Sequence, residues 1–296
     1  MTILVNFSDK NFEQSRIRLN ASALSNGIDK ILSRDETFIK NTDFFKNQQK
    51  IFKNKKGFGY WIWKPFLILD ALNNSNNGDV IVYSDAGIEI TDNISPLVSL
   101  CLKHDILLFA NGNLKNRFWV KRDCFILMNA DSKNFWNGPQ TDASFCLFSN
   151  SAQSKIFVEE WLSYCVDERI IGDMRNLMGR RNFWGFQAHR HDQSVLSLLA
   201  IKHHIELFRQ PSQFGNYYKS EEYRVEGEFK CVNQFNSKQV QHYSLNPCQN
   251  SPYFQLLNHH RNKIETPVKE DISFVKRMLR PVTRRIQKVI KFLSRQ

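Results

Sequence analysis

The sequence predicts an α/β fold with a mostly parallel central sheet, and three observations support it. Residues 2–7 and 80–84 are compact apolar runs that end in polar loops, which is typical of buried strands. Segments of helical periodicity lie between these runs and after them. Strands that alternate with helices favour parallel pairing, because each helix carries the chain back across the sheet. No internal repeat or low-complexity linker divides the chain, so a single domain with a C-terminal extension is the simplest interpretation.

Each element follows from its local pattern. The first strand stops at Ser8-Asp9, and Asn26-Gly27 closes the helix that comes next. Pro65 suits the first turn of a helix, where no backbone donor is needed, and Asp192 opens a strongly apolar helical segment. The expected helices are residues 12–23, 42–52, 66–72, 151–164 and 192–203, and the further expected strands are residues 30–32, 105–109, 143–148 and 205–208.

Length and composition exclude several classes of protein. The chain has 296 residues, of which 42% are apolar and 13% aromatic. This apolar content is enough to bury a core, so a disordered or collagen-like chain is excluded. The formal net charge is +12, from 41 Lys+Arg and 29 Asp+Glu. Such an excess is typical of a protein that binds a polyanion: nucleic acid, anionic lipid or a phosphorylated ligand.

The sequence shows no signal for export. No basic segment is followed by a long apolar stretch at the start, and no apolar stretch is long enough to span a bilayer. The six cysteines are widely separated and form no CxxC pair, which favours reduced thiols over a zinc site or a disulfide framework. We therefore expect a cytoplasmic protein.

Much of the positive charge lies in residues 269–296. Nine Lys and Arg stand there against Glu270 and Asp271, a net +7, so residues 1–268 carry only +5. Apolar residues recur in this tail at steps of three and four, which predicts a basic amphipathic helix that Pro281 kinks. We expect a main domain at 1–268 and a helix at 269–296 on the inner membrane surface. The alternative is a solvated helix or a partly disordered tail.

A carboxylate follows the apolar strand at residues 80–84. In the run VIVYSDAG, Asp85 enters a turn, and Ala86 and Gly87 leave room for a bulky ligand. Ligands of open parallel sheets bind at the carboxyl ends of strands. A carboxylate there can hold a divalent cation, and the cation can hold a diphosphate. The alternative is an aspartate that caps a turn.

The densest aromatic cluster is GFGYWIWKP, residues 57–65. Tyr60, Trp61 and Trp63 beside Lys64 suit a flat base or sugar ring and a phosphate. The alternative is core packing, since the two tryptophans are spaced like neighbours on a strand and aromatic residues are usually buried.

Further polar residues precede predicted elements. Asp192 and Gln193 can face a polar substrate, and His191 can exchange protons, although an N-cap role for Asp192 is the alternative. Small polar residues around Gln140 and Asp142 can line a pocket or form a turn. His242 lies late in the chain, where it is either a metal ligand or a surface residue.

Taken in order, these blocks resemble nucleotide-sugar glycosyltransferases of the GT-A fold. The N-terminal strand, GYWIWKP, YSDAG, TDASFCLF and HDQSVL carry the resemblance, which is strongest to transferase-like proteins encoded among bacterial and viral polysaccharide genes. The resemblance covers residues 1–245, and the pairing of GYWIWKP with YSDAG is its most specific part. It implies a GT-A-like, Rossmann-related domain.

The resemblance also implies roles for single residues. Asp85 matches the first aspartate of the metal-binding Asp-x-Asp motif, and the loop that begins at Asn6 and Phe7 matches the region that holds the base. Asp192 and Gln193 match the pair that faces the transferred sugar or the acceptor, and we add His191 to this catalytic set. The predicted donor-binding residues are Asn6, Phe7, Tyr60, Trp63, Lys64, Asp85, Ala86, Gly87, Gln140 and Asp142.

One position departs from the motif. Gly87 stands where the second aspartate would be, which removes a metal ligand. Glu89 or Asp92 is an alternative ligand, and Lys64 with nearby arginines is an alternative source of positive charge. We still expect a divalent cation, manganese or magnesium, with Asp85 and His242 as its ligands.

The sequence therefore predicts a nucleotide-sugar-dependent glycosyltransferase. We expect it to bind a nucleotide-sugar donor and a glycan or lipid-linked acceptor in surface polysaccharide synthesis, because a leaving nucleoside diphosphate needs a nearby cation. An inactive relative that binds glycans or nucleotide sugars is the alternative, and the departure at Gly87 leaves it open. Nucleic-acid binding is least favoured, because most of the charge excess lies in the tail and GYWIWKP carries a single lysine.

Overall fold

The computed structural model describes residues 1–215, 224–225, 228–229 and 250–260. Residues Met1–Arg261 form one compact unit. The helix predicted at 269–296 and the predicted metal ligand His242 both lie outside the described residues. Within the described part, no helix is long and apolar enough to cross a membrane.

The central sheet has six strands in the order β2-β1-β3-β6-β5-β7. β1 pairs in parallel with β2 and β3, and β5 pairs in parallel with β7, whereas β6 is antiparallel to both β3 and β5. All strands except β6 therefore run the same way, which confirms the predicted α/β class with a mostly parallel sheet. The strands are β1 (Thr2–Phe7), β2 (Lys30–Arg34), β3 (Val80–Ser84), β5 (Ile106–Lys115), β6 (Pro139–Ser149) and β7 (Leu207–Phe208).

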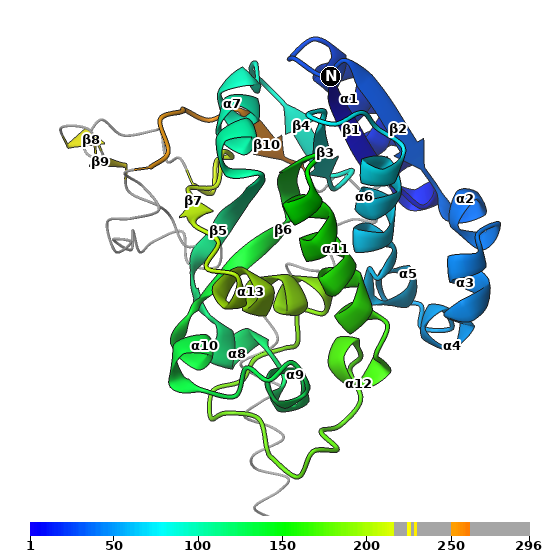
Figure 1. Cartoon of the computed structure of the whole chain (residues 1–296), viewed down its shortest axis with the longest axis vertical. Helices are drawn as coiled ribbons and strands as arrows, with labels where there is room; N and C mark the ends of the chain where they lie inside the picture. The colour runs from blue at the N-terminus through cyan, green and yellow to red at the C-terminus, as the bar shows by residue number, and fades with distance from the viewer. Residues whose placement is uncertain (216–223, 226–227, 230–249, 261–296) are drawn as a thin grey trace, which may run out of the picture. The chain divides into compact units, whose positions relative to one another are not determined.

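Helices cover both faces of the sheet (Figure 1). Val5 and Ile81 point to one face and join a hydrophobic cluster with α6, α11 and α13. Leu4 and Val82 point to the other face and join a second cluster with α1 and α7. This division follows from the two-residue repeat of a strand. The helices are α1 (Glu13–Leu24), α6 (Trp63–Asn73), α7 (Ser95–His104), α11 (Ala152–Cys165) and α13 (Asp192–Lys202).

Shorter elements complete the described part. The small strands pair as two separate antiparallel ribbons, β4 with β10 and β8 with β9. These elements are η1 (Lys10–Phe12), α2 (Glu36–Lys40), α3 (Asp43–Asn47), α4 (Gln49–Phe52), α5 (Gly57–Tyr60), β4 (Ile88–Ile90), α8 (Asn116–Trp119), α9 (Arg122–Leu127), α10 (Lys133–Asn137), α12 (Glu168–Ile171), β8 (Arg224–Val225), β9 (Glu228–Phe229) and β10 (Leu257–His259).

Two predicted elements differ from the structure. Residues 42–52 form α3 and α4 instead of one helix, and the hydroxyl of Thr42 caps the first of them by accepting a hydrogen bond from the Phe45 amide at 3.2 Å. The strand-like spacing of Trp61 and Trp63 was misleading, because neither residue lies on a strand: Trp61 has a left-handed backbone conformation and Trp63 begins α6. Their alternative role in core packing agrees with the structure, where Trp63 is buried and Trp61 is partly buried against the same cluster.

Residues 57–61 form an unusual left-handed turn. Each of the five has φ between 47° and 81°. Such a backbone costs a residue with a side chain about 1–2 kcal/mol, whereas glycine adopts it freely. Gly57 is also required sterically, since a Cβ there would lie 2.3 Å from the indole ring of Trp61. Strain of this kind persists only where the surrounding structure fixes it, and it gathers at functional sites.

The segment at 250–260 returns to the end of β3. β10 pairs with β4, and the amide of His260 donates a hydrogen bond to the carbonyl oxygen of Gly87 at 2.6 Å. A Cβ on Gly87 would lie 2.8 Å from the carbonyl oxygen of His260. The room that we predicted here for a ligand is therefore taken by the backbone of the chain itself.

Candidate functional site

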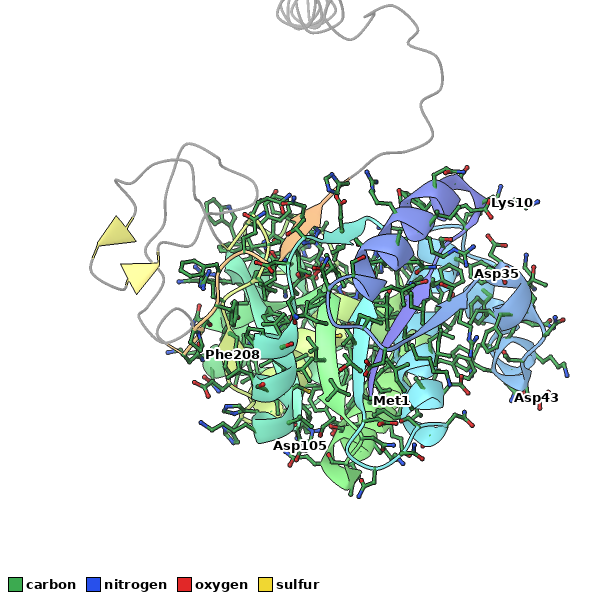
Figure 2. All side chains as sticks on the ribbon, turned by 90° about the horizontal axis from the view of Figure 1, so that it is seen from above. Met1, Lys10, Asp35, Asp43, Asp105 and Phe208 are labelled. Atoms are coloured by element: carbon green, nitrogen blue, oxygen red, sulfur yellow. The ribbon has the colours of Figure 1, made fainter. Side chains whose placement is uncertain are left out.

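Polar side chains gather at the carboxyl edge of the sheet. Phe7 ends β1 and Asp85 directly follows β3 at this edge. Met1 and Asp105 precede β1 and β5 and lie at one end of the strands, whereas Lys10 follows β1 and lies at the other end (Figure 2). Because open α/β sheets bind ligands at the carboxyl ends of their strands, this edge is the candidate ligand-binding region.

The centre of the candidate site is the ammonium group of Lys64. Lys64 lies in the first turn of α6, and its Nζ donates a hydrogen bond to the carbonyl oxygen of Ala143 in β6 at 2.7 Å. The same nitrogen lies 3.2 Å from an oxygen of Asp85 and 3.2 Å from an oxygen of Asp192. The hydroxyl of Tyr83 donates to Asp85 at 2.7 Å. Elements from distant parts of the sequence thus meet at one buried cation.

Burial and charge act in opposite directions on these groups. Burial lowers the pKa of Lys64, but Asp192 and Asp85 together outweigh it, so that this pKa is raised. Burial raises the pKa of Asp192 to about 6, while Lys64 opposes the rise and Asp85 adds to it. The side chain of Asp192 is 5% exposed and that of Asp85 is 40% exposed. Asp85 is therefore the carboxylate that can meet a substrate, and Asp192 is held inside.

His191 occupies a strained position just before α13. Its backbone has φ 51° and ψ −120°, and it takes the N-cap position that we had considered for Asp192. The imidazole Nδ1 lies 2.8 Å from the carbonyl oxygen of Ile171, and the ring stacks on Tyr60 with centroids 4.8 Å apart. Burial lowers the pKa of His191 to about 4. At neutral pH the imidazole ring is therefore uncharged.

Gln193 and Gln140 form a chain of amide hydrogen bonds. Gln193 Nε2 donates to Gln140 Oε1 at 3.0 Å, and Gln140 Nε2 donates to Asn116 Oδ1 at 2.7 Å. Gln140 is fully buried, whereas Gln193 is partly exposed. The chain therefore fixes the amide of Gln193 from behind.

The predicted base-binding residues lie within the fold. Asn6 is fully buried and donates to Asn20 Oδ1 at 2.8 Å, and its own Oδ1 has no hydrogen-bond partner within the described residues. Phe7 is buried and stacks on Trp63 with ring centroids 4.0 Å apart. These side chains brace the end of β1 against α6.

Asp142 and Ala86 are also buried. The carboxylate of Asp142 accepts hydrogen bonds from the amide and the hydroxyl of Ser144, both at 2.9 Å, and one from the side chain of Gln210. Asp142 thus ties β6 to the segment that follows β7 at the same edge of the sheet.

The described residues do not by themselves fit a divalent cation. One oxygen of Asp85 already faces the ammonium group of Lys64, and the alternative ligand Glu89 pairs with His260 at 2.6 Å. Across the described ranges, no group of three or more His, Cys, Asp or Glu is placed to hold a metal ion. The predicted ligand His242 lies outside these ranges, so the ligand set that we predicted is not brought together here.

Three participants were missed by sequence reasoning. Tyr83 lies in β3, two residues before Asp85, and the two-residue repeat of extended backbone could have placed both on one face. The Ala143 carbonyl and His260 carry no such signal, because β6 and β10 approach β3 and β4 through pairings between distant segments.

No family model and no curated protein sequence matches the chain. Several solved glycosyltransferases are similar to it in structure. Mouse xyloside xylosyltransferase 1, in its apo form, is 14% identical over 90% of this chain and 100% of that chain, with a TM-score of 0.46. The bifunctional glycosyltransferase WbbM is 10% identical over 88% of this chain and 46% of that one, with a TM-score of 0.48. The galactosyltransferase LgtC, solved with donor and acceptor sugar analogues, is 14% identical over 88% of this chain and 87% of that one, with a TM-score of 0.44. Similarities of this size concern the arrangement of helices and strands.

Proposed function

We propose that this protein is a glycosyltransferase that moves a sugar from a nucleotide-diphosphate sugar to a glycan or glycolipid acceptor. The observation that carries the proposal is the cation between two carboxylates at the carboxyl edge of the sheet. Lys64 holds Asp85 and Asp192 within 3.2 Å of one nitrogen, and Asp85 keeps part of its carboxylate open to solvent.

The exposed carboxylate gives Asp85 the substrate-facing role. It can accept hydrogen bonds from the hydroxyl groups of a sugar, and its position is fixed by Tyr83 and Lys64. Such fixing favours transfer, because a preorganised group needs no reorientation when the bond breaks. Asp192 and Lys64 are buried and act as positioning residues in this proposal. Gln193, whose amide is held by Gln140, supplies a second polar group.

The finer parts of the prediction remain proposals. Surface polysaccharide synthesis is the proposed setting, and the proposed location is the cytoplasmic face of the membrane, reached through residues 269–296. A divalent cation is proposed only as an ion that is bound by the donor diphosphate, because the described residues do not complete a protein site for it. No step is assigned to it.

The test is turnover by the full chain with a panel of UDP- and GDP-sugars, each with and without manganese. We expect release of the nucleoside diphosphate with at least one donor, and loss of this release in Asp85→Asn. The matched control is Asp43→Asn, because Asp43 is an exposed aspartate of α3 that lies outside this ion-pair cluster. Absence of turnover and of any thermal shift with every donor would count against the proposal.

An inactive binding relative is the second candidate. It is favoured by Gly87, where the backbone of His260 occupies the place of a second aspartate. This candidate predicts a thermal shift with a nucleotide sugar but no turnover. In that case Asp85→Asn would weaken the shift and change no rate.

A further inference from the structure

The segment between α12 and α13, residues 173–188, presents large apolar side chains to solvent. It forms the long loop at the bottom of Figure 1, in yellow-green. Trp184 is 96% exposed, which makes it the most exposed of the large hydrophobic residues in the described part. Met174, Leu177 and Met178 are exposed beside it in the sequence. Single exposed apolar residues are ordinary, but four within eleven positions of one segment are more than scattered exposure explains, and they are typical of a docking segment.

The shape of the 173–188 segment is fixed by two buried side chains of the main body. The Nζ of Lys121 donates to the carbonyl oxygen of Met174 at 2.9 Å. The carboxylate of Asp123 accepts hydrogen bonds from the backbone amides of Leu177 at 2.6 Å and Met178 at 3.1 Å. Because these contacts hold the backbone, the outward direction of the apolar side chains is a built feature of the fold.

Apart from Asp173, its first residue, the 173–188 segment carries only positive charges. Arg175, Arg180 and Arg181 are exposed, and no Asp or Glu occurs from Met174 through His191. A surface of exposed Trp, Leu and Met within a field of arginines complements an anionic bilayer. Tryptophan favours the headgroup level, aliphatic side chains reach the acyl boundary, and arginines pair with anionic headgroups.

A single-stranded nucleic acid would use a different surface. It requires several aromatic side chains along a basic path, on which successive bases stack. In the 173–188 segment only Trp184 is an exposed aromatic residue, since Phe183 and Phe186 are partly buried. The exposed neighbours are aliphatic, and these offer a base no ring to stack on.

We propose that the 173–188 segment docks on an anionic lipid surface. Stable peripheral attachment takes two signals, and residues 269–296, with their net charge of +7, supply the second. The 173–188 segment leads directly into His191 and Asp192, so docking holds the candidate site next to the bilayer. This consequence for a lipid-linked acceptor rests on the proposed function, whereas lipid binding itself does not.

The test uses the full chain and sedimentation with vesicles. One set of vesicles is phosphatidylcholine, and the other mixes phosphatidylcholine and phosphatidylglycerol in equal parts. Replacing Arg175, Arg180 and Arg181 by Gln should weaken binding to the mixed vesicles about 100-fold, at about fivefold for each arginine. The matched control replaces three exposed lysines elsewhere, Lys10, Lys53 and Lys103, by Gln and should change binding far less.

The apolar contribution is tested separately. The double variant Leu177→Ser and Trp184→Ser should bind the mixed vesicles more weakly by a factor of about ten or more, since burying even one such side chain is worth about that factor. Its control is Leu102→Ser with Ile156→Ser, which are exposed apolar residues on α7 and α11. Lipids with brominated chains should quench the fluorescence of the wild type more than that of Trp184→Phe. Unchanged melting temperatures in all variants show that the fold is intact.

Four outcomes would overturn the proposal. The first is equal vesicle binding by the wild type and both loop variants. The second is a loss of binding only when the cations of 269–296 are replaced. The third is equal binding to neutral and anionic vesicles. The fourth is binding to an oligonucleotide, but not to vesicles, that depends on the same arginines; this would make nucleic acid the partner. None of these measurements uses turnover, so they stand apart from the donor test above.

Discussion

Replacing Lys64 by methionine removes the buried charge at the centre of the site and keeps most of the side-chain volume. An oxygen of Asp192, 3.2 Å from the lost ammonium, would stay inside the protein beside Asp85. At an effective dielectric constant of about 20, two charges at this distance attract by about 5 kcal/mol. After desolvation is included, breaking a buried pair costs about 3–5 kcal/mol. Asp85 adds little to this, because its exposed carboxylate is screened by water.

The assay is urea unfolding of Lys64→Met and the wild type at two pH values. We expect the free energy of unfolding to fall by about 3–5 kcal/mol at about pH 8. Without its cation, Asp192 has a pKa even higher than the value of about 6 that burial already gives it. At about pH 5 the carboxyl group is then protonated and neutral, so the loss of stability should be smaller there.

Lys121→Met is the control, because Lys121 is an equally buried lysine with different partners. Its ammonium donates to the carbonyl oxygens of Gly172 and Met174 at 3.2 Å and 2.9 Å, and within the described part of the chain no carboxylate forms a direct ion pair with it. We expect a loss of about 1–3 kcal/mol that is the same at both pH values. Equal losses for the two lysine variants, or a Lys64→Met loss that does not change with pH, would refute the ion-pair argument.

Three other changes test the site and the turns around it. The pKa of Asp192 is raised from 3.8 to about 6, so the stabilisation by its protonated form is complete below about pH 4 and is lost as the pH rises through about 6. The loss is about 3 kcal/mol. The free energy of unfolding of the wild type, minus that of Asp192→Asn, should therefore fall by this amount across the range, and a difference that does not change with pH would contradict it. Gly57→Ala should lower the melting temperature far more than Gly78→Ala, because both have positive φ but only the first Cβ meets a ring, at 2.3 Å, and equal shifts would contradict this. Gly87→Ala should speed hydrogen exchange of the His260 amide, which donates to Gly87, and unchanged exchange would show that the contact is not formed.

The strands that are buried on both faces could be predicted from the sequence. Thr2–Phe7 and Val80–Ser84 read as continuous apolar runs because each has neighbouring strands on both sides and helices above and below. The direction of β6 could not be predicted, since an apolar run pairs equally well either way and its direction depends on β3 and β5. The left-handed turn at 57–61 was also hidden, because alternating aromatic residues imitate a strand and its distinguishing signal is the pair of glycines.

The site could be predicted residue by residue but not as an arrangement. Local patterns singled out Asp85, Lys64 and Asp192, each with its own alternative role. Their meeting at one nitrogen depends on how α6 and α13 pack on the sheet, and no spacing in the sequence encodes that distance. The burial of Gln140 was missed for the same reason, because a polar residue at the start of a strand gives no sign of a partner such as Asn116.

The hydrogen bond from Lys64 to Ala143 also bears on how the protein is made. The two residues are 79 positions apart, and Asp192 is synthesised later still. A nascent chain that ends before β6 lacks the Ala143 carbonyl oxygen that accepts the hydrogen bond from Lys64. Its Lys64 ammonium group then either stays in water or is buried without a partner, and burial of an unpaired charge is costly. The first strands therefore cannot reach their final packing as an independent folding unit. Asp192 and β7 both follow β6 in the chain, so neither the site nor the six-stranded sheet can be completed until these later segments have been made.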